Sequence, residues 1–114
     1  MIAVIFEVFP SHGGAEKYFD IATSLKGDLE QIEGFISVER FESVTSKGKY
    51  LSLSFWRDEQ AVQQWRNLGQ HRKAQAAGRK EVFADYRLRV ATVIRDYGMS
   101  QRDEAPKDSR DIND

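Results

Sequence analysis

The chain contains no cysteine, which excludes disulfide bridges, thiolate metal sites and cysteine nucleophiles. Its two histidines, His12 and His71, lie far apart in the sequence, so a histidine metal centre would need both of them plus carboxylates, and we expect no metal site. No apolar run approaches the roughly 18 residues of a membrane-spanning helix. No basic region precedes the apolar N-terminal stretch, so we expect no signal peptide. We therefore expect a cytoplasmic protein with no membrane contact.

The composition is that of an ordinary globular protein. The chain has 114 residues, of which 40% are hydrophobic and 31% charged, enough for one domain with a real core. The net charge is −1, although Lys and Arg outnumber Asp and Glu between residues 57 and 95. That basic stretch either forms a solvated surface or attracts a small anionic molecule. Because the whole chain is not basic and aromatic residues do not alternate with Lys or Arg, we expect no nucleic-acid partner.

Hydrophobic periodicity predicts four strands and two helices. The apolar run 2–9, the alternating runs 35–41 and 50–56, and the long alternating segment 86–95 are strands. Apolar residues at 15, 18, 22, 25, 29 and 32 form one helical stripe, and Gly34 suits the end of that helix. Asp58 is a good N-cap for a second helix, which we expect to continue, after an interruption at Gly69, to about Phe83.

This order of elements predicts an α+β, ferredoxin-like βαββαβ domain over residues 1–98, with two helices covering one face of a four-stranded antiparallel sheet. The other face also carries large apolar side chains, and a second copy is the simplest cover, so we expect a homodimer with two sheets packed face to face. Half of residues 99–114 are charged, and the apolar ones are only Met99, Ala105 and Ile112. We expect this segment to be a disordered C-terminal tail.

One cluster of residues suggests chemistry. Trp65 lies in the predicted second helix, and His71 follows it shortly after Gly69. If the helix restarts at Gly69, both side chains can border one cavity between the helices and the sheet, with Gln75 one turn beyond His71. A histidine there can take a proton from a phenol or enol near neutral pH. The same pattern also fits a core Trp65 and a surface His71, and the sequence leaves both interpretations open.

Several short motifs together resemble the antibiotic biosynthesis monooxygenase (ABM) family over residues 1–97. They are Gly34-Phe35, Leu53-Ser54-Phe55-Trp56-Arg57-Asp58-Glu59, Trp65-Arg66, His71-Arg72, Ala74-Gln75, Gly78-Arg79 and Asp85-Tyr86. The resemblance implies a dimeric ferredoxin-like α/β barrel. The family includes cofactor-free monooxygenases of phenolic polyketides, quinol monooxygenases, haem-degrading oxygenases and members with no known substrate.

The cofactor-free branch implies a cofactor-independent monooxygenase that oxidises a small phenolic, quinol or polyketide-like aromatic substrate with O₂. In that interpretation His71 is the catalytic base and Trp65 a wall of the pocket. Arg66, Arg72 or Arg79 favours the phenolate, and all three arginines and Gln75 are substrate-binding residues.

Two alternatives stay open. One is a non-enzymatic dimeric module that binds a small hydrophobic ligand. The other is a haem-binding or haem-degrading protein with His71 as an axial ligand. The haem-degrading branch has an asparagine on the first strand and a histidine at the place of Gln75, and this chain has neither. We therefore expect no cofactor.

Overall fold

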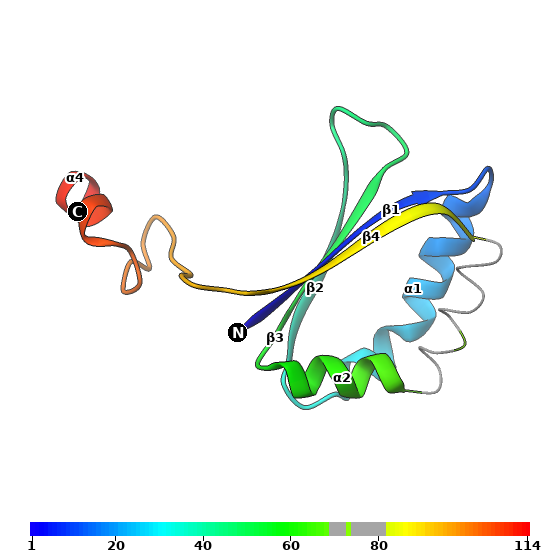
Figure 1. The fold of residues 1–114 in the computed structure, drawn as a ribbon, viewed down its shortest axis with the longest axis horizontal. Helices are drawn as coiled ribbons and strands as arrows, with labels where there is room; N and C mark the ends of the chain where they lie inside the picture. Colours follow the sequence, from blue (N-terminus) through cyan, green and yellow to red (C-terminus); the bar gives the residue numbers. More distant parts are fainter. Residues whose placement is uncertain (69–72, 74–81) are drawn as a thin grey trace.

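The structure, a computed structural model, describes residues 1–68, 73 and 82–114. The elements follow the order β1 (Ile2–Pro10), α1 (Gly14–Glu30), β2 (Phe35–Glu42), β3 (Tyr50–Trp56), α2 (Glu59–Asn67), β4 (Phe83–Thr92) and α4 (Lys107–Asn113). The strands form one sheet in the order β2-β3-β1-β4, and every neighbouring pair is antiparallel. Helices α1 and α2 both lie on the same face of this sheet (Figure 1). The predicted ferredoxin-like α+β fold is confirmed.

Two local predictions at element boundaries are also confirmed. Gly34 adopts a positive φ of 95°, and a Cβ there would lie 2.9 Å from the Cβ of Ala61, so only glycine fits easily. Asp58 caps α2, because its carboxylate accepts a hydrogen bond of 3.0 Å from the backbone N–H of Ala61. That hydrogen bond favours the charged carboxylate and lowers the pKa of Asp58 below its ordinary value.

The second half of the chain departs from the expectation at one boundary. β4 begins at Phe83, so the predicted helix does not extend to Phe83 and the last strand starts earlier than Tyr86. The cause is the end of β1, where the pairing with β4 shifts register between Phe9 and Pro10 and still reaches Phe83. Except for Lys73, which is helical, the predicted helix between residues 69 and 81 lies outside the described residues.

The face of the sheet away from the helices is mixed, with apolar side chains on β3 and charged ones on β4. Strand alternation places Ile5 of β1 and Leu51, Leu53 and Phe55 of β3 on this outer face. Glu7 shares it, 3.6 Å from the Nζ of Lys49 and 3.5 Å from Arg89 on β4. Glu7 is therefore a paired surface carboxylate. The homodimer that would cover this face stays a prediction.

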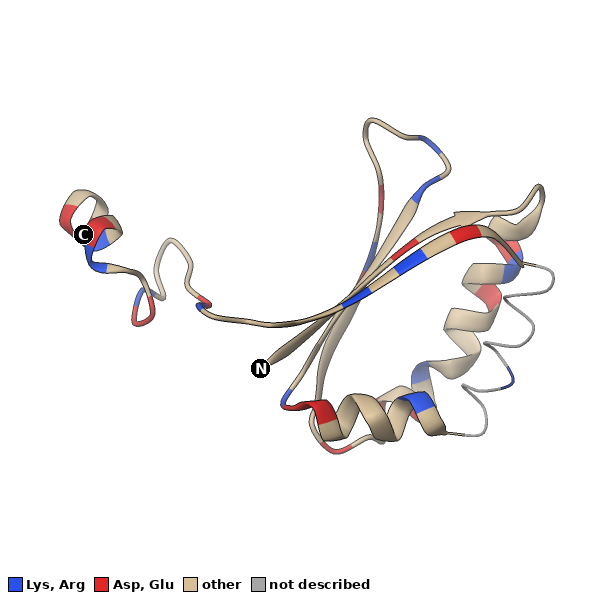
Figure 2. Cartoon of the chain, in the orientation of Figure 1, with Lys and Arg blue, Asp and Glu red and all other residues tan. Residues whose placement is uncertain are grey.

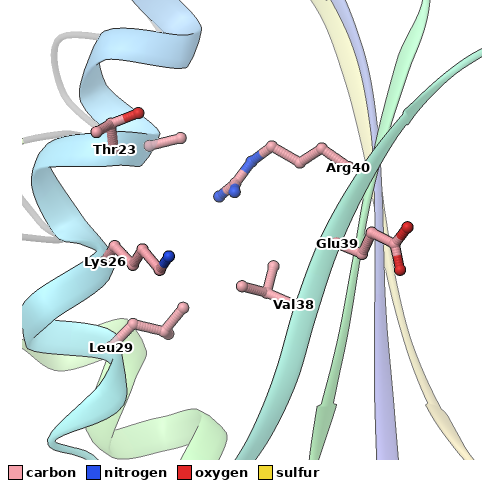
Figure 3. A pocket seen from close by; sticks show the side chains of 7 residues that line it. Thr23, Lys26, Leu29, Val38, Glu39 and Arg40 are labelled. Atoms are coloured by element: carbon pink, nitrogen blue, oxygen red, sulfur yellow. The ribbon is translucent and has the colours of Figure 1, made fainter.

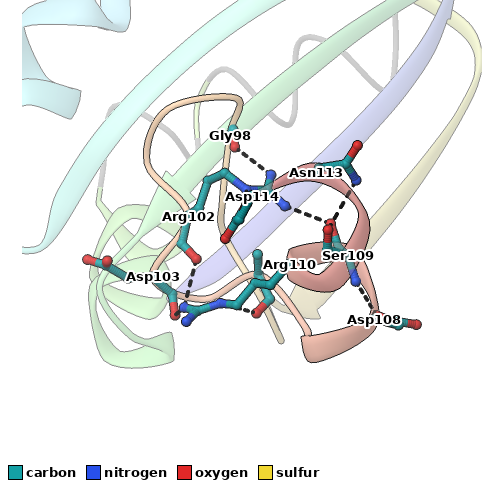
Figure 4. Close-up of polar contacts among 9 residues, drawn as sticks. Gly98, Arg102, Asp103, Asp108, Ser109, Arg110, Asn113 and Asp114 are labelled. Carbon is teal, nitrogen blue, oxygen red and sulfur yellow. Dashed lines mark hydrogen bonds and ion pairs between the residues drawn. The ribbon is translucent and has the colours of Figure 1, made fainter.

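The C-terminal segment runs away from the sheet and ends in α4 (Figure 1). It is held by its own arginines (Figure 4). Arg102 donates to the carbonyl of Gly98 at 3.1 Å and to Ser109 Oγ at 2.7 Å, and Arg110 donates to the carbonyl of Ala105 at 3.0 Å. Charges of both signs surround α4 (Figure 2). The domain boundary at residue 98 and the disorder of the tail stay predictions.

Candidate functional site

A cavity of about 360 Å³ lies between the two helices and the sheet. All four strands contribute to its floor, β2 through Arg40 alone, and α1 and α2 supply most of its walls. The lining is mainly apolar and includes Val4, Phe6, Ile21, Leu25, Val62, Trp65, Phe83, Tyr86, Leu88 and Val90. Such a mostly apolar hollow with a few polar groups is the usual form of a small-molecule site.

The cavity exists because the core under the helices is divided into two clusters. One cluster buries Leu29, Trp56, Ala61 and Val62, and the other buries Val8, Tyr18 and Val82. Between them, the helix-facing side of β3 carries two small residues, Ser52 and Ser54, flanked by Tyr50 and Trp56. The indole Nε1 of Trp56 donates a hydrogen bond of 2.9 Å to Ser54 Oγ, which fixes both side chains. The space above the two serines is left unfilled by the described core residues.

Two of the predicted site residues lie at this cavity. Trp65 is half-buried, packs against the cluster around Trp56 and lines the cavity, so it is both a core residue and a wall. Arg66 lies in the last turn of α2 and also lines the cavity. Their binding roles stay predictions.

The remaining predicted site residues, His71, Arg72, Gln75 and Arg79, lie outside the described residues. Whether Trp65 and His71 share one cavity therefore stays a prediction. The expectation of no metal site also stays a prediction. Within residues 1–68, 73 and 82–114, no three His, Asp or Glu side chains lie together in a way that could hold a metal ion.

The sequence interpretation did not identify Tyr18 as a cavity residue. Tyr18 is only 6% exposed and lines the cavity from α1, and its Oη has no hydrogen-bond partner among the described residues. Its ring packs against Phe19 and Phe83, with centroids 5.2 and 5.8 Å away. The helical stripe correctly indicates burial for this residue, but it carries no information about the partner of the hydroxyl group.

The charged groups of the described lining are all cationic. Arg40 and Arg66 line the cavity, and no described carboxylate does. Basic side chains at the edge of an apolar hollow produce a positive potential that attracts anionic or electron-rich molecules.

A second hollow of about 340 Å³ opens between α1 and β2 and shares Ala22 and Arg40 with the cavity. Figure 3 shows Arg40 of β2 and Lys26 of α1 pointing into this gap, with Leu29 and Val38 beside them. Glu39 points to the opposite side of β2 in the same view. The second hollow is therefore a basic opening at the edge of the apolar cavity.

Known proteins resemble this chain in sequence and in fold. The family model described as "Antibiotic biosynthesis monooxygenase" matches residues 1–77. A protein of Pyricularia oryzae named jasmonate monooxygenase ABM is 46% identical over 93 residues, which are 82% of this chain and 43% of the relative. The uncharacterized protein YqjZ of Bacillus subtilis is 32% identical over 93 residues, 82% of this chain and 79% of the relative.

Solved structures share the fold at low sequence identity. A Deinococcus radiodurans protein assigned to the antibiotic biosynthesis monooxygenases superposes with a TM-score of 0.76 at 14% identity, covering 86% of this chain and 97% of that one.

The chain belongs to the antibiotic biosynthesis monooxygenase family. It spans less than half the length of the Pyricularia relative.

Proposed function

We propose that the protein is a cofactor-independent monooxygenase that oxidises a small phenolic, quinol or polyketide-like aromatic molecule with O₂ in the cavity between α1, α2 and the sheet. The observation that carries the proposal is the cavity itself. A family-typical fold holds an apolar hollow of about 360 Å³ with Trp65 and Arg66 at its wall. Its size and lining suit one flat organic molecule.

The proposed chemistry balances without a reductant. A phenol loses its proton, the phenolate passes an electron to O₂, and recombination with loss of water gives a quinone. One phenol and one O₂ thus yield one quinone and one H₂O. The protein must supply a base, stabilise the anion and exclude water.

Each of these tasks has a candidate in this chain. The apolar walls exclude water, and Trp65 offers a stacking surface. Arg66, with its fixed positive charge, favours the phenolate over the phenol. His71 is the proposed base, and Arg72, Gln75 and Arg79 complete the proposed substrate contacts. Tyr18 adds a hydroxyl group without a described partner, which can donate to an oxygen of the substrate.

The Pyricularia relative adds a second substrate candidate. Its name assigns it a jasmonate, and its 46% identity over 93 residues makes a jasmonate worth testing beside the aromatic compounds.

Oxygen uptake by the purified protein tests the proposal. A hydroquinone and a phenolic polyketide are offered without added metal, flavin, haem or reductant, and we expect uptake with at least one of them. A jasmonate has no phenol, and its hydroxylation by one O₂ also takes two electrons and two protons, so it is offered both with and without a two-electron donor such as NADPH. In Ser52→Leu, a larger side chain on the cavity floor should abolish that uptake, whereas Ser37→Leu, on the outer face of β2, should retain it.

Three results would contradict the proposal. Uptake that survives in Ser52→Leu would separate the activity from the cavity. Binding of the test compounds without any uptake would favour the non-enzymatic binding module. A Soret band on adding haemin, with oxygen uptake only in its presence, would favour the haem protein.

We also propose a homodimer formed through the outer face of the sheet. Ile5, Leu53 and Phe55 lie on that face, and Phe41 on β2 is 42% exposed. Contact with a second copy would remove this apolar surface from water, at about 25 cal/mol for each Å² buried. Light scattering should give twice the chain mass of 13.1 kDa, and a particle of 13.1 kDa at micromolar concentration would contradict the dimer.

A further inference from the structure

We propose that the substrate carries an anionic group, in the simplest case a carboxylate, which lies between Lys26 and Arg40 while the apolar part of the molecule occupies the main cavity. This inference rests on the proposed function in placing the substrate in the same cavity. It adds the class of substrate, a small apolar acid, and the two residues that select it.

The geometry supports one continuous site. Arg40 lines both hollows, and its register partner on β3 is Ser52 on the cavity floor. Its guanidinium extends from β2 toward α1 (Figure 3). Lys26 lies one helical turn after Ala22, the other residue shared by both hollows, and points into the same gap. A molecule filling the apolar cavity would therefore have its outer end between these two cations.

The electrostatics of the opening favour an anion. Neither Lys26 nor Arg40 forms an ion pair with a carboxylate among the described residues, and Glu39, the acidic residue at this hollow, points to the other face of β2. Leu29 and Val38 form apolar walls beside the two cations. Lys26 and Arg40 are both exposed, so water screens part of their charge, while the apolar walls on one side make their attraction for an anion stronger than at a fully open surface.

The two side chains suit a carboxylate in different ways. A guanidinium presents parallel N–H groups that can hold both oxygens of a carboxylate, and an ammonium adds a compact charge. Isolated basic residues on a surface are usually only solvated. Here two of them converge, from a helix and from a strand, on the opening of an apolar cavity.

Calorimetric binding of matched probes tests this inference. 4-Phenylbutanoate and 4-phenylbutanamide have nearly the same shape and differ in charge, and decanoate and decanamide form a second pair with a longer apolar body. We expect the acid of at least one pair to bind about tenfold more tightly than its amide at low salt. This preference should shrink in 0.5 M NaCl, because salt screens partly exposed charges.

Substitutions locate the effect. Arg40→Met should weaken binding of the acid about tenfold, equivalent to about 1.4 kcal/mol, and leave the amide unchanged. Lys26→Met should cause a smaller loss of the same kind, and Arg40→Lys should retain part of the preference for the acid. Lys47→Met is the matched control, because it removes one positive charge from the turn between β2 and β3, outside both hollows.

Several results would overturn the inference. The inference is wrong if the wild-type protein binds acid and amide equally, or if it binds neither acid. It is also wrong if Arg40→Met loses as much affinity for the amide as for the acid, or if Lys47→Met loses as much affinity for the acid as Arg40→Met does. The salt dependence of the wild-type protein keeps the test decisive even if a variant fails to fold. A preference for acids without any oxygen uptake would contradict the proposed function and leave the anion site standing. Oxygen uptake with neutral phenols and no preference for acids would contradict the anion site and leave the proposed function standing.

Discussion

Replacing Tyr18 by phenylalanine should stabilise the protein. The Tyr18 side chain is 6% exposed, and its Oη is buried without a hydrogen-bond partner among the described residues. A buried hydroxyl group without a partner costs roughly 1–3 kcal/mol, because it has lost its hydrogen bonds to water and gained none. Phenylalanine removes that group and keeps the ring that packs between Phe19 and Phe83.

The lower end of this range already gives a measurable shift. The entropy of unfolding is about 2.1 cal/mol/K per residue, so about 100 folded residues contribute about 0.2 kcal/mol/K. A gain of about 1 kcal/mol in the free energy of unfolding therefore raises Tm by about 5 °C. Thermal unfolding followed by circular dichroism, and urea titration at the same protein concentration, would measure both quantities.

Tyr50→Phe is the control, because Tyr50 also packs against Phe19 but is only half-buried. We expect a change within about 0.5 kcal/mol for that variant. A fall in Tm for Tyr18→Phe would refute the reasoning, since it would mean that the hydroxyl forms a stabilising hydrogen bond within the folded chain. If a ligand accepts a hydrogen bond from Tyr18, the same variant should gain stability and lose affinity.

Three further predictions concern the cap of α2, the proposed base and the tail. Asp58→Ala should lower Tm near pH 7, while Asp58→Asn, which keeps an oxygen acceptor for the N–H of Ala61, should lower it less. The folded pKa of Asp58 lies below the ordinary value of an aspartate, so the ionised cap contributes stability above about pH 4. The difference in Tm from Asp58→Ala should therefore shrink as the pH falls through that lowered pKa. A constant difference in thermal melts from about pH 7 to about pH 2 would be inconsistent with this cause. His71→Ala should reduce turnover of a phenolic substrate by about 10²–10⁴ and remove a rise in rate near pH 6.5, with little change in Tm; unchanged steady-state rates and pH profile would exclude His71 as the base. Deleting residues 99–114 should leave Tm unchanged, and a loss of several degrees in a thermal scan would show that this segment docks on the folded protein.

The sequence predicted the fold well because its signals are local. The apolar stripe of α1, the alternation in β2 and β3, the cap at Asp58 and the glycine at position 34 each follow from the geometry of one element. The start of β4 was misplaced because an apolar residue such as Phe83 fits either a helix or a strand. Its assignment depends on pairing with Pro10 at the distant end of β1.

The candidate site was harder to predict because it depends on contacts between elements. Alternation separates Ser52 and Ser54 from Leu51 and Leu53, but it does not say which pair faces the helices. Likewise, nothing local brings Lys26 of α1 and Arg40 of β2 to one opening. Trp65 was identified because an aromatic residue beside a possible base is a recognisable pattern, and the structure places it at the cavity.

The central claim is that the cavity supports cofactor-free oxygenation, and isotope labelling tests it most directly. The purified protein is incubated under ¹⁸O₂ with whichever phenol or quinol supports oxygen uptake, and the product is reduced at once, before its carbonyl oxygen exchanges with water, and analysed by mass spectrometry. The account predicts one ¹⁸O atom in each product molecule and the other in water, with no metal, flavin, haem or reductant added. Products without ¹⁸O, or turnover that begins only when one of these groups is supplied, would contradict it.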